Sequence, residues 1–233
     1  MSEPNVNVIT RTAPRTNVKT ITSLAMLTAL AYIAMCVSKI LPQVAGFLQL
    51  EIKDTVICIG GFVFGPLAAA IISIVVALVE MFTVSDTGPI GCIMNVIATV
   101  AFCCTASFVY KKMHTKKGAV IGLSLGVVVL AAVMVLWNYL ITPLYMTGFS
   151  RSDIAAMLIP IFLPFNLLKG ALNMALCLVL YKPVVTALRR ARLVPESSAV
   201  KSNQKRSNVG VALFSFALVA TFVTLAMVMM GKL

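Results

Sequence analysis

Seven long apolar runs constrain the fold of this chain more than any other feature of its sequence. A membrane-spanning helix needs about 20 mostly apolar residues, because the hydrocarbon core is about 30 Å thick. The runs are 21–41, 47–64, 66–83, 90–110, 119–140, 160–181 and 209–230. Charged residues make up only 11% of the chain, against about 25% in soluble domains. We therefore expect an all-α integral membrane protein with six helices and, after a polar stretch, a seventh C-terminal transmembrane helix.

This pattern predicts four segments along the chain. They are a cytoplasmic N-terminal segment at 1–20, a six-helix membrane domain at 21–185, a basic cytoplasmic linker at 186–208 and the additional helix at 209–230. The first apolar run is longer than the 7–15 residues or so of a signal-peptide core, so we interpret it as a spanning helix.

The second and third helices are predicted to form a tight hairpin through "GGFVFGP". Gly65 suits the end of one helix and Pro66 suits the first position of the next. Glu51, Lys53 and Asp54 stand at the start of the second helix and shorten its apolar part.

Lys and Arg set the predicted orientation, because cytoplasmic loops of membrane proteins are enriched in them. The N-terminus and the loop "KKMHTKK" are basic, which places both in the cytoplasm and the C-terminus outside. The net charge of +12 therefore needs no nucleic-acid partner. Most acids are expected at or beyond the outer face: Glu51, Asp54, Glu80, Asp86 and Asp153.

The outer loop "ITPLYMTGFSRSDIAAML" is less polar than a solvated loop. Two interpretations stay open: a lid that folds back on the bundle, or an interfacial helix among the lipid headgroups.

The sixth helix carries a polar stripe that calls for an explanation. Asn166, Lys169 and Asn173 stand at i, i+3 and i+7 and share one face of a helix. A charge in the middle of a spanning helix costs roughly 2.5–3.5 kcal/mol on insertion scales, so such residues normally face the bundle interior and mark functional sites.

Other helices place polar residues at the same outer depth. Asn95 lies in the fourth helix and Asn138 near the end of the fifth, while Lys39 and Glu80 end the first and third. We predict a polar pocket that opens outward, with these substrate-binding candidates: Asn138, Asn166, Lys169, Asn173, Asn95, Glu51 and Tyr145. The alternative is that Asn and Lys only hold helices together, for which contacts contribute about 0.6 kcal/mol on average.

The sequence also lacks the motifs of catalysis. It contains no phosphate-binding loop, no H-E-x-x-H and no G-x-S-x-G. The six cysteines and His114 do not have the spacing of a metal site. We expect a binder or carrier rather than an enzyme, with no metal and no cofactor.

A stripe of small residues marks the first helix. Ala25 and Ala29 lie four residues apart, in line with Tyr32 and Cys36. Small residues at this spacing let another helix approach closely, either from a partner or within the bundle.

Four stretches carry a resemblance to a known family: "LAMLTALAYIAM", "LQLEIKDTVICIGGFVFGPLAAAI", "WNYLITPLY" and "PFNLLKGALNMALCLVLYKPV". The chain resembles the substrate-binding S component of energy-coupling factor (ECF) vitamin transporters, and among these the riboflavin-specific type. The resemblance implies a six-helix fold that binds riboflavin from outside as a transported substrate. The additional helix at 209–230 departs from the family pattern.

The resemblance also implies partners and residue roles. Ala25 and Ala29 match the stripe that docks onto the membrane coupling subunit, which joins two cytoplasmic ATPase subunits; in transport the S component topples in the membrane. Asn166 and Lys169 match polar ligand contacts, and Asn138 looks like the contact in the fifth helix. The acid that pairs with Lys169 stays open among Glu51, Asp54 and Glu80. The alternatives are an S component for another vitamin, such as thiamine, and a stand-alone secondary carrier, which often shows internal repeats.

Overall fold

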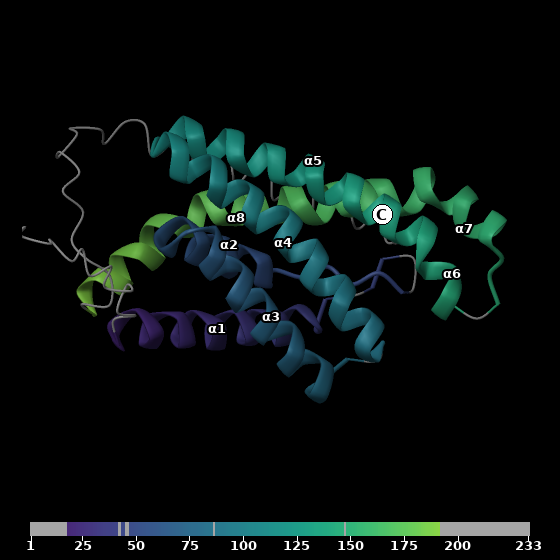
Figure 1. The fold of residues 1–233 in the computed structure, drawn as a ribbon, viewed down its shortest axis with the longest axis horizontal. Coiled ribbons are helices and arrows are strands. Elements are labelled where there is room, and N and C mark those ends of the chain that lie inside the picture. Colours follow the sequence, from purple (N-terminus) through teal and green to yellow (C-terminus); the bar gives the residue numbers. More distant parts are fainter. Residues whose placement is uncertain (1–17, 42, 45–46, 86, 147, 192–233) are drawn as a thin grey trace, which may run out of the picture.

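The computed structural model describes residues 18–41, 43–44, 47–85, 87–146 and 148–191. These residues form a bundle of helices that run along its long axis (Figure 1). Within them, five helical segments are long and apolar enough to cross a membrane: α1 (Val18–Ser38), α3 (Pro66–Thr83), α4 (Gly88–Met113), α5 (Lys116–Leu140) and the continuous stretch Arg151–Arg190. The chain is thus a multi-pass membrane protein. The predicted helix at 209–230, Asp86 and most of the predicted linker lie outside the described residues.

The prediction of a second spanning helix from Phe47 is wrong. Helix α2 (Lys53–Phe64) has 12 residues and is about 18 Å long at 1.5 Å per residue, too short to cross the bilayer. Residues 47–52 are not helical. Irregular backbone at membrane depth needs partners inside the protein. Here the Ile52 N–H donates to the Ser38 hydroxyl at 3.0 Å, and the Glu51 carbonyl accepts from the Asn173 side chain at 2.7 Å.

The hairpin between α2 and α3 is confirmed. Gly65 has a φ of 96°, a left-handed conformation that favours glycine, and Pro66 is the first residue of α3. The two helices therefore return along each other, and the start of α2 lies in the middle of the bundle beside the last turns of α3.

Helix α8 (Leu163–Arg190) continues past the predicted end at Tyr181 and past residue 185, where the linker was predicted to begin. Val185 and Leu188 are buried in the core, which stabilises this extension. Arg189 and Arg190 lie in its last turn, where positive charge interacts favourably with the helix dipole.

Close packing of α4 and α5 fixes the centre of the bundle. A Cβ atom at Gly122 or Gly126 would lie 2.7 Å from a backbone oxygen of α4, those of Ala106 and Phe102 respectively. Phe102 and Leu123 are fully buried at this contact. Apolar side chains on the outside, such as Phe82 and Leu67, are largely exposed, as expected of surfaces that meet lipid.

The segment after α5 packs against α5, and both interpretations of it, the lid and the interfacial helix, stay predictions. It comprises α6 (Thr142–Tyr145), α7 (Arg151–Met157) and a π-helical turn, η1 (Leu158–Phe162), that leads into α8. Ile154 of α7 is fully buried against the bundle. Pro160 and Pro164 lack the N–H groups that a regular α-helix needs here, which accounts for the π-helical turn.

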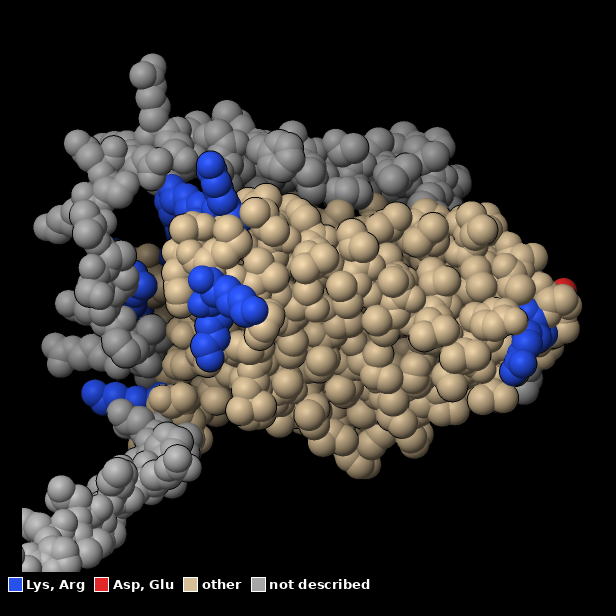
Figure 2. All heavy atoms as spheres, turned by 45° about the horizontal axis from the view of Figure 1, so that its top comes forward, with Lys and Arg blue, Asp and Glu red and all other residues tan. Residues whose placement is uncertain are grey.

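Most of the Lys and Arg side chains in view gather at one end of the molecule, whereas the other end shows a smaller basic group beside an acid (Figure 2). The basic end holds the starts of α1 and α5 and the ends of α4 and α8, with Lys19, Lys111, Lys112, Lys116, Lys117, Lys182, Arg189 and Arg190. The bundle is therefore polarised along its axis, and α6 and α7 cap the opposite end.

Candidate ligand-binding cavity

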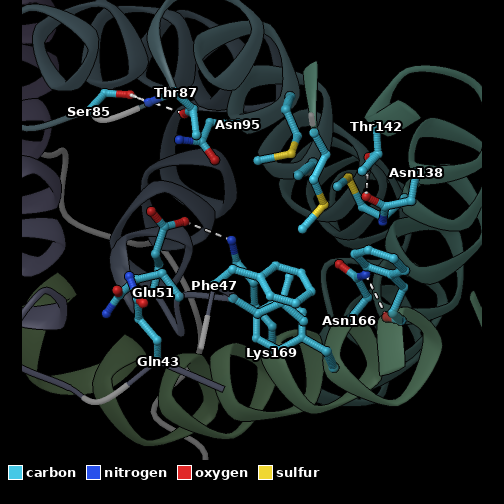
Figure 3. A pocket seen from close by; sticks show the side chains of 18 of the residues that line it. Gln43, Phe47, Glu51, Ser85, Thr87, Asn95, Asn138, Thr142, Asn166 and Lys169 are labelled. Carbon is cyan, nitrogen blue, oxygen red and sulfur yellow. Dashed lines mark hydrogen bonds and ion pairs between the residues drawn. The ribbon is translucent and has the colours of Figure 1, made fainter. Parts of the chain in front are cut away.

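A cavity of about 350 Å³ lies at the end of the bundle opposite the basic end (Figure 3). Its walls come from the start of α4, the ends of α3 and α5, the first turns of α8 and the segments before α2 and after α5. The lining residues include Gln43, Phe47, Glu51, Glu80, Thr87, Met94, Asn95, Met134, Asn138, Thr142, Tyr145, Met146, Phe162, Phe165, Asn166 and Lys169. Its volume falls within the range of small-molecule sites.

The polar groups lie on two sides of the cavity. Glu51, Gln43 and Asn95 lie on one side, and Asn138 and Asn166 lie on the other (Figure 3). Such an arrangement can orient a ligand that has polar groups at both ends.

Aromatic and sulfur-containing side chains fill the walls between these polar groups. They are Phe47, Phe162, Phe165, Met94, Met134 and Met146. The rings of Phe47 and Phe162 meet edge to face, with their centroids 5.9 Å apart. These walls suit the flat, apolar body of a ligand.

Lys169 pairs with Glu51, the first of the three acids that the sequence left open. The Lys169 Nζ atom lies 2.7 Å from Oε2 of Glu51. Oε1 of Glu51 lies 3.1 Å from the Lys53 Nζ atom, and Lys53 also binds the Glu80 carboxylate. We call these four residues, Lys169, Glu51, Lys53 and Glu80, the ion chain.

Three of the acids lie inside the bundle, contrary to their predicted place at the outer face. Glu51, Asp54 and Glu80 were expected at or beyond the outer face, but each is at most 4% exposed within the bundle. Burial is tolerated because each ion in the chain has a partner of opposite charge. Asp54 stands apart from the ion chain and accepts a hydrogen bond from the Thr99 hydroxyl at 2.7 Å.

Several polar side chains at the cavity keep hydrogen-bonding capacity for a ligand. An ammonium has three donors, and Glu51 takes one of those on Lys169. The Asn166 amide nitrogen donates to the Phe162 carbonyl at 2.7 Å, and its side-chain oxygen has no partner among the described residues. On the other side, the Asn138 oxygen accepts from the Thr142 hydroxyl at 2.9 Å, which leaves the amide nitrogen as a donor.

Asn173 does not line the cavity, contrary to its place among the predicted pocket residues. Its side-chain oxygen accepts from the N–H and the hydroxyl of Thr55, at 2.9 and 2.8 Å. Its nitrogen donates to the carbonyls of Glu51 and Lys169, at 2.7 and 3.0 Å. Asn173 holds the start of α2 against α8, which is the helix-joining role that the sequence left as an alternative.

The remaining predicted residues lie together around the cavity: Asn138, Asn166, Lys169, Asn95, Glu51 and Tyr145. The predicted set did not include Gln43, Thr142 or the individual aromatic residues Phe47, Phe162 and Phe165. Gln43 is a polar residue within the stretch "LPQVAGF", and Phe162 and Phe165 flank Asn166 closely, so these signals were present in the sequence.

Ala25 and Ala29 lie on the outer surface of α1, away from the cavity. Both are exposed, whereas Leu27, Ala31 and Met35 form the buried face of this helix. Ala25 and Ala29 therefore do not pack against the other described helices, and docking at this surface stays a prediction. Tyr32, farther along the stripe, donates to the Thr83 hydroxyl at 2.9 Å.

No group of His, Cys, Asp and Glu side chains in the described part of the chain is arranged to hold a metal ion. All six cysteines are free, and four of them, Cys58, Cys92, Cys103 and Cys177, are buried.

Comparisons with known proteins point to one family. The family model of the ECF transporter substrate-specific component matches residues 19–181. The riboflavin transporter RibU of Staphylococcus aureus is 29% identical over 178 residues, which cover 74% of this chain and 93% of that protein. The riboflavin transporter FmnP of Bacillus subtilis is 26% identical and is covered over 98% of its length, with 76% of this chain.

A solved structure agrees with these relatives. It is described as the S component of a bacterial ECF transporter and is superposed with a TM-score of 0.63 at 26% identity. The superposition covers 74% of this chain and 99% of that one.

Proposed function

The chain belongs to the family of ECF transporter substrate-specific components, and on this premise we propose that it binds riboflavin in the cavity and mediates riboflavin uptake. The observation that carries the proposal is the cavity itself, with amides and an ammonium at its edges and aromatic and methionine walls between them. The names of the relatives in Staphylococcus aureus and Bacillus subtilis favour riboflavin over other vitamins.

The chemistry of riboflavin fits this cavity. Its ring system is flat, with apolar faces and with carbonyl, N–H and ring-nitrogen groups along one edge, and its side chain is a row of hydroxyls. Phe47, Phe162 and Phe165 supply surfaces for the ring. Asn166, Asn138 and Lys169 supply donors and an acceptor for the ring edge or the hydroxyls.

The ion chain supports a neutral ligand. Riboflavin is uncharged near pH 7 and does not neutralise the Lys169 ammonium. Glu51 does so within the protein, at 2.7 Å. The ammonium is thereby held in the bundle without a charged ligand and still offers hydrogen bonds.

We further propose that the cavity faces the outside of the cell. Most of the described Lys and Arg residues gather at the other end of the bundle (Figure 2), which suits the cytoplasmic side. In this orientation the N-terminus is cytoplasmic, and the predicted helix at 209–230 would bring the C-terminus outside.

Transport against a gradient requires partner subunits, since the sequence has no phosphate-binding loop. Family membership implies an ECF module. We propose that this module consists of a membrane coupling subunit and two cytoplasmic ATPases, and that the exposed Ala25 and Ala29 dock onto the coupling subunit. This chain then acts as a binding subunit without enzymatic activity of its own.

Titration of purified protein with riboflavin tests the proposal. We expect flavin fluorescence to be quenched with a Kd below about 1 μM, equivalent to roughly −8 kcal/mol. Quenching should persist in the presence of excess thiamine. Absence of quenching, with thiamine bound instead, would retain the family and overturn the substrate. Riboflavin accumulation by this chain reconstituted alone would favour the stand-alone carrier.

A further inference from the structure

Lys53 is a buried cation that stands behind the cavity. It is 2% exposed and is absent from the cavity lining, whereas both of its carboxylate partners, Glu51 and Glu80, line the cavity. Its Nζ atom lies 3.1 Å from Glu51 Oε1 and also binds Glu80 Oε2. Lys53 thus contacts the site only through these two acids.

The ion chain is balanced in charge. It contains two ammonium groups, on Lys53 and Lys169, and two carboxylates, on Glu51 and Glu80. Without Lys53, the carboxylates of Glu51 and Glu80, with the buried Asp54 carboxylate next in the sequence, would face the single ammonium of Lys169 in a site of low dielectric. Their mutual repulsion and the unpaired charge would displace Glu51, Glu80 or both.

The geometry also divides the Glu51 carboxylate between two partners. Lys53 binds Oε1, and Lys169 binds Oε2 at 2.7 Å. With one oxygen occupied from behind, Glu51 keeps its other oxygen toward α8, and the Lys169 ammonium is fixed at the cavity wall. The Asn173 side chain donates to the Glu51 carbonyl, and the Ile52 N–H donates to the Ser38 hydroxyl, so this backbone is held in place.

We infer that Lys53 is a positioning residue for the riboflavin site: it balances Glu51 and Glu80 and thereby orients Lys169 toward the ligand. This inference rests on the proposed function, because affinity for riboflavin is its readout. In a purely structural role, the Lys53 side chain would instead be needed for folding through its shape and packing, whatever the charge of its neighbours.

Charge rescue separates these two roles. Lys53→Met removes the charge but keeps an unbranched side chain of similar length. The double variant Lys53→Met/Glu80→Gln removes one positive and one negative charge and leaves the balanced pair of Glu51 and Lys169. Lys111→Met serves as the matched control, since Lys111 is exposed at the basic end. Each full-length variant is purified, checked for monodispersity and titrated with riboflavin.

We expect Lys53→Met to weaken riboflavin binding at least about 30-fold, because removing one member of a buried charge pair leaves the other unpaired. The double variant should bind at least about fivefold more tightly than Lys53→Met, since neighbouring residues of one network are coupled. Lys111→Met should bind as the wild type does. If Lys53→Met does not fold but the double variant folds and binds, charge balance is supported as well.

Three outcomes would overturn the inference while the proposed function stands. They are wild-type affinity in a folded Lys53→Met, a folded double variant that binds no better than Lys53→Met or not at all, and failure of both variants to fold. Absence of riboflavin binding by the wild type would overturn the proposed function and this inference with it.

Discussion

Asn166 and Asn173 lie on the same face of α8, two turns apart, and they have different roles. Asn166 lines the cavity, and its side-chain oxygen is available to a ligand. The side chain of Asn173, in contrast, makes four hydrogen bonds to Thr55, Glu51 and Lys169. The difference comes from what each residue faces. Asn173 meets the irregular backbone before α2, which needs hydrogen-bond partners, and Asn166 meets a cavity. Polar residues at membrane depth therefore mark either a ligand or a break in a neighbouring helix.

The largest expected effect on stability comes from Asn173. Asn173→Leu removes the hydrogen bonds to Thr55 and leaves the Glu51 carbonyl without its side-chain donor, whereas the Thr55 N–H keeps the Ile52 carbonyl as an acceptor at 3.2 Å. A buried unsatisfied group costs about 1–3 kcal/mol, so we expect a clear fall in the melting temperature in detergent. The matched variant Asn166→Leu should lower it far less. Equal melting temperatures for the two variants would contradict the assignment of a structural role to Asn173 and a cavity role to Asn166.

Lys169 lies between the two asparagines, and its replacement tests whether it binds the ligand or only pairs with Glu51. Lys169→Ala should weaken riboflavin binding by about 1.5–3 kcal/mol, the usual contribution of a hydrogen bond to a charged group. Affinity is measured on monodisperse protein. A well-folded variant with unchanged affinity would mean that Lys169 serves only to pair with Glu51 inside the bundle.

Asn138 tests the opposite side of the cavity. Asn138→Ala removes an amide that lines the cavity and accepts from Thr142. The expected loss is about 1 kcal/mol of riboflavin binding, typical of a neutral hydrogen bond. Isothermal titration calorimetry resolves a change of this size. The variant for comparison is Asn173→Leu, which changes a residue outside the cavity. An unchanged affinity would place the ligand nearer the Lys169 side.

Ala25 and Ala29 provide the case in which no change of affinity is expected. Ala25→Trp places a large side chain on the exposed face of α1 and blocks close approach of another helix. We expect riboflavin affinity within about twofold of the wild type, because the residue is remote from the cavity, and loss of co-purification with the coupling subunit. The two measurements are made on the same preparation. Loss of both properties, or retention of both, contradicts docking at this surface.

The sequence predicts most of the helices but not the break before α2. The apolar runs predict α1, α3, α4 and α5, because a spanning helix needs about 20 mostly apolar residues. Residues 47–52 contain four apolar residues, Phe47, Leu48, Leu50 and Ile52, yet they are irregular. The Ser38 hydroxyl and the Asn173 side chain bind backbone groups of this segment. Such bonds join residues from distant parts of the chain and leave no periodic signal.

The same limit applies to the candidate site. Helical spacing places Asn166, Lys169 and Asn173 on one face, but it does not distinguish a cavity from a neighbouring chain segment opposite each residue. The partner of Lys169 depends on where the irregular segment brings Glu51, 118 positions away along the sequence. The polar character of the site was predictable from residue types, and its division into binding and structural groups was not.

A structure of the full chain with riboflavin bound would show directly which residues of α8 bind the ligand. We expect one riboflavin molecule in the cavity, with its ring against Phe47 and Phe162 and with hydrogen bonds between the ligand and Asn166 and Lys169, while Asn173 keeps its bonds to Thr55 and Glu51. Riboflavin bound elsewhere, or bound in the cavity without contact to Asn166 and Lys169, would contradict this expectation.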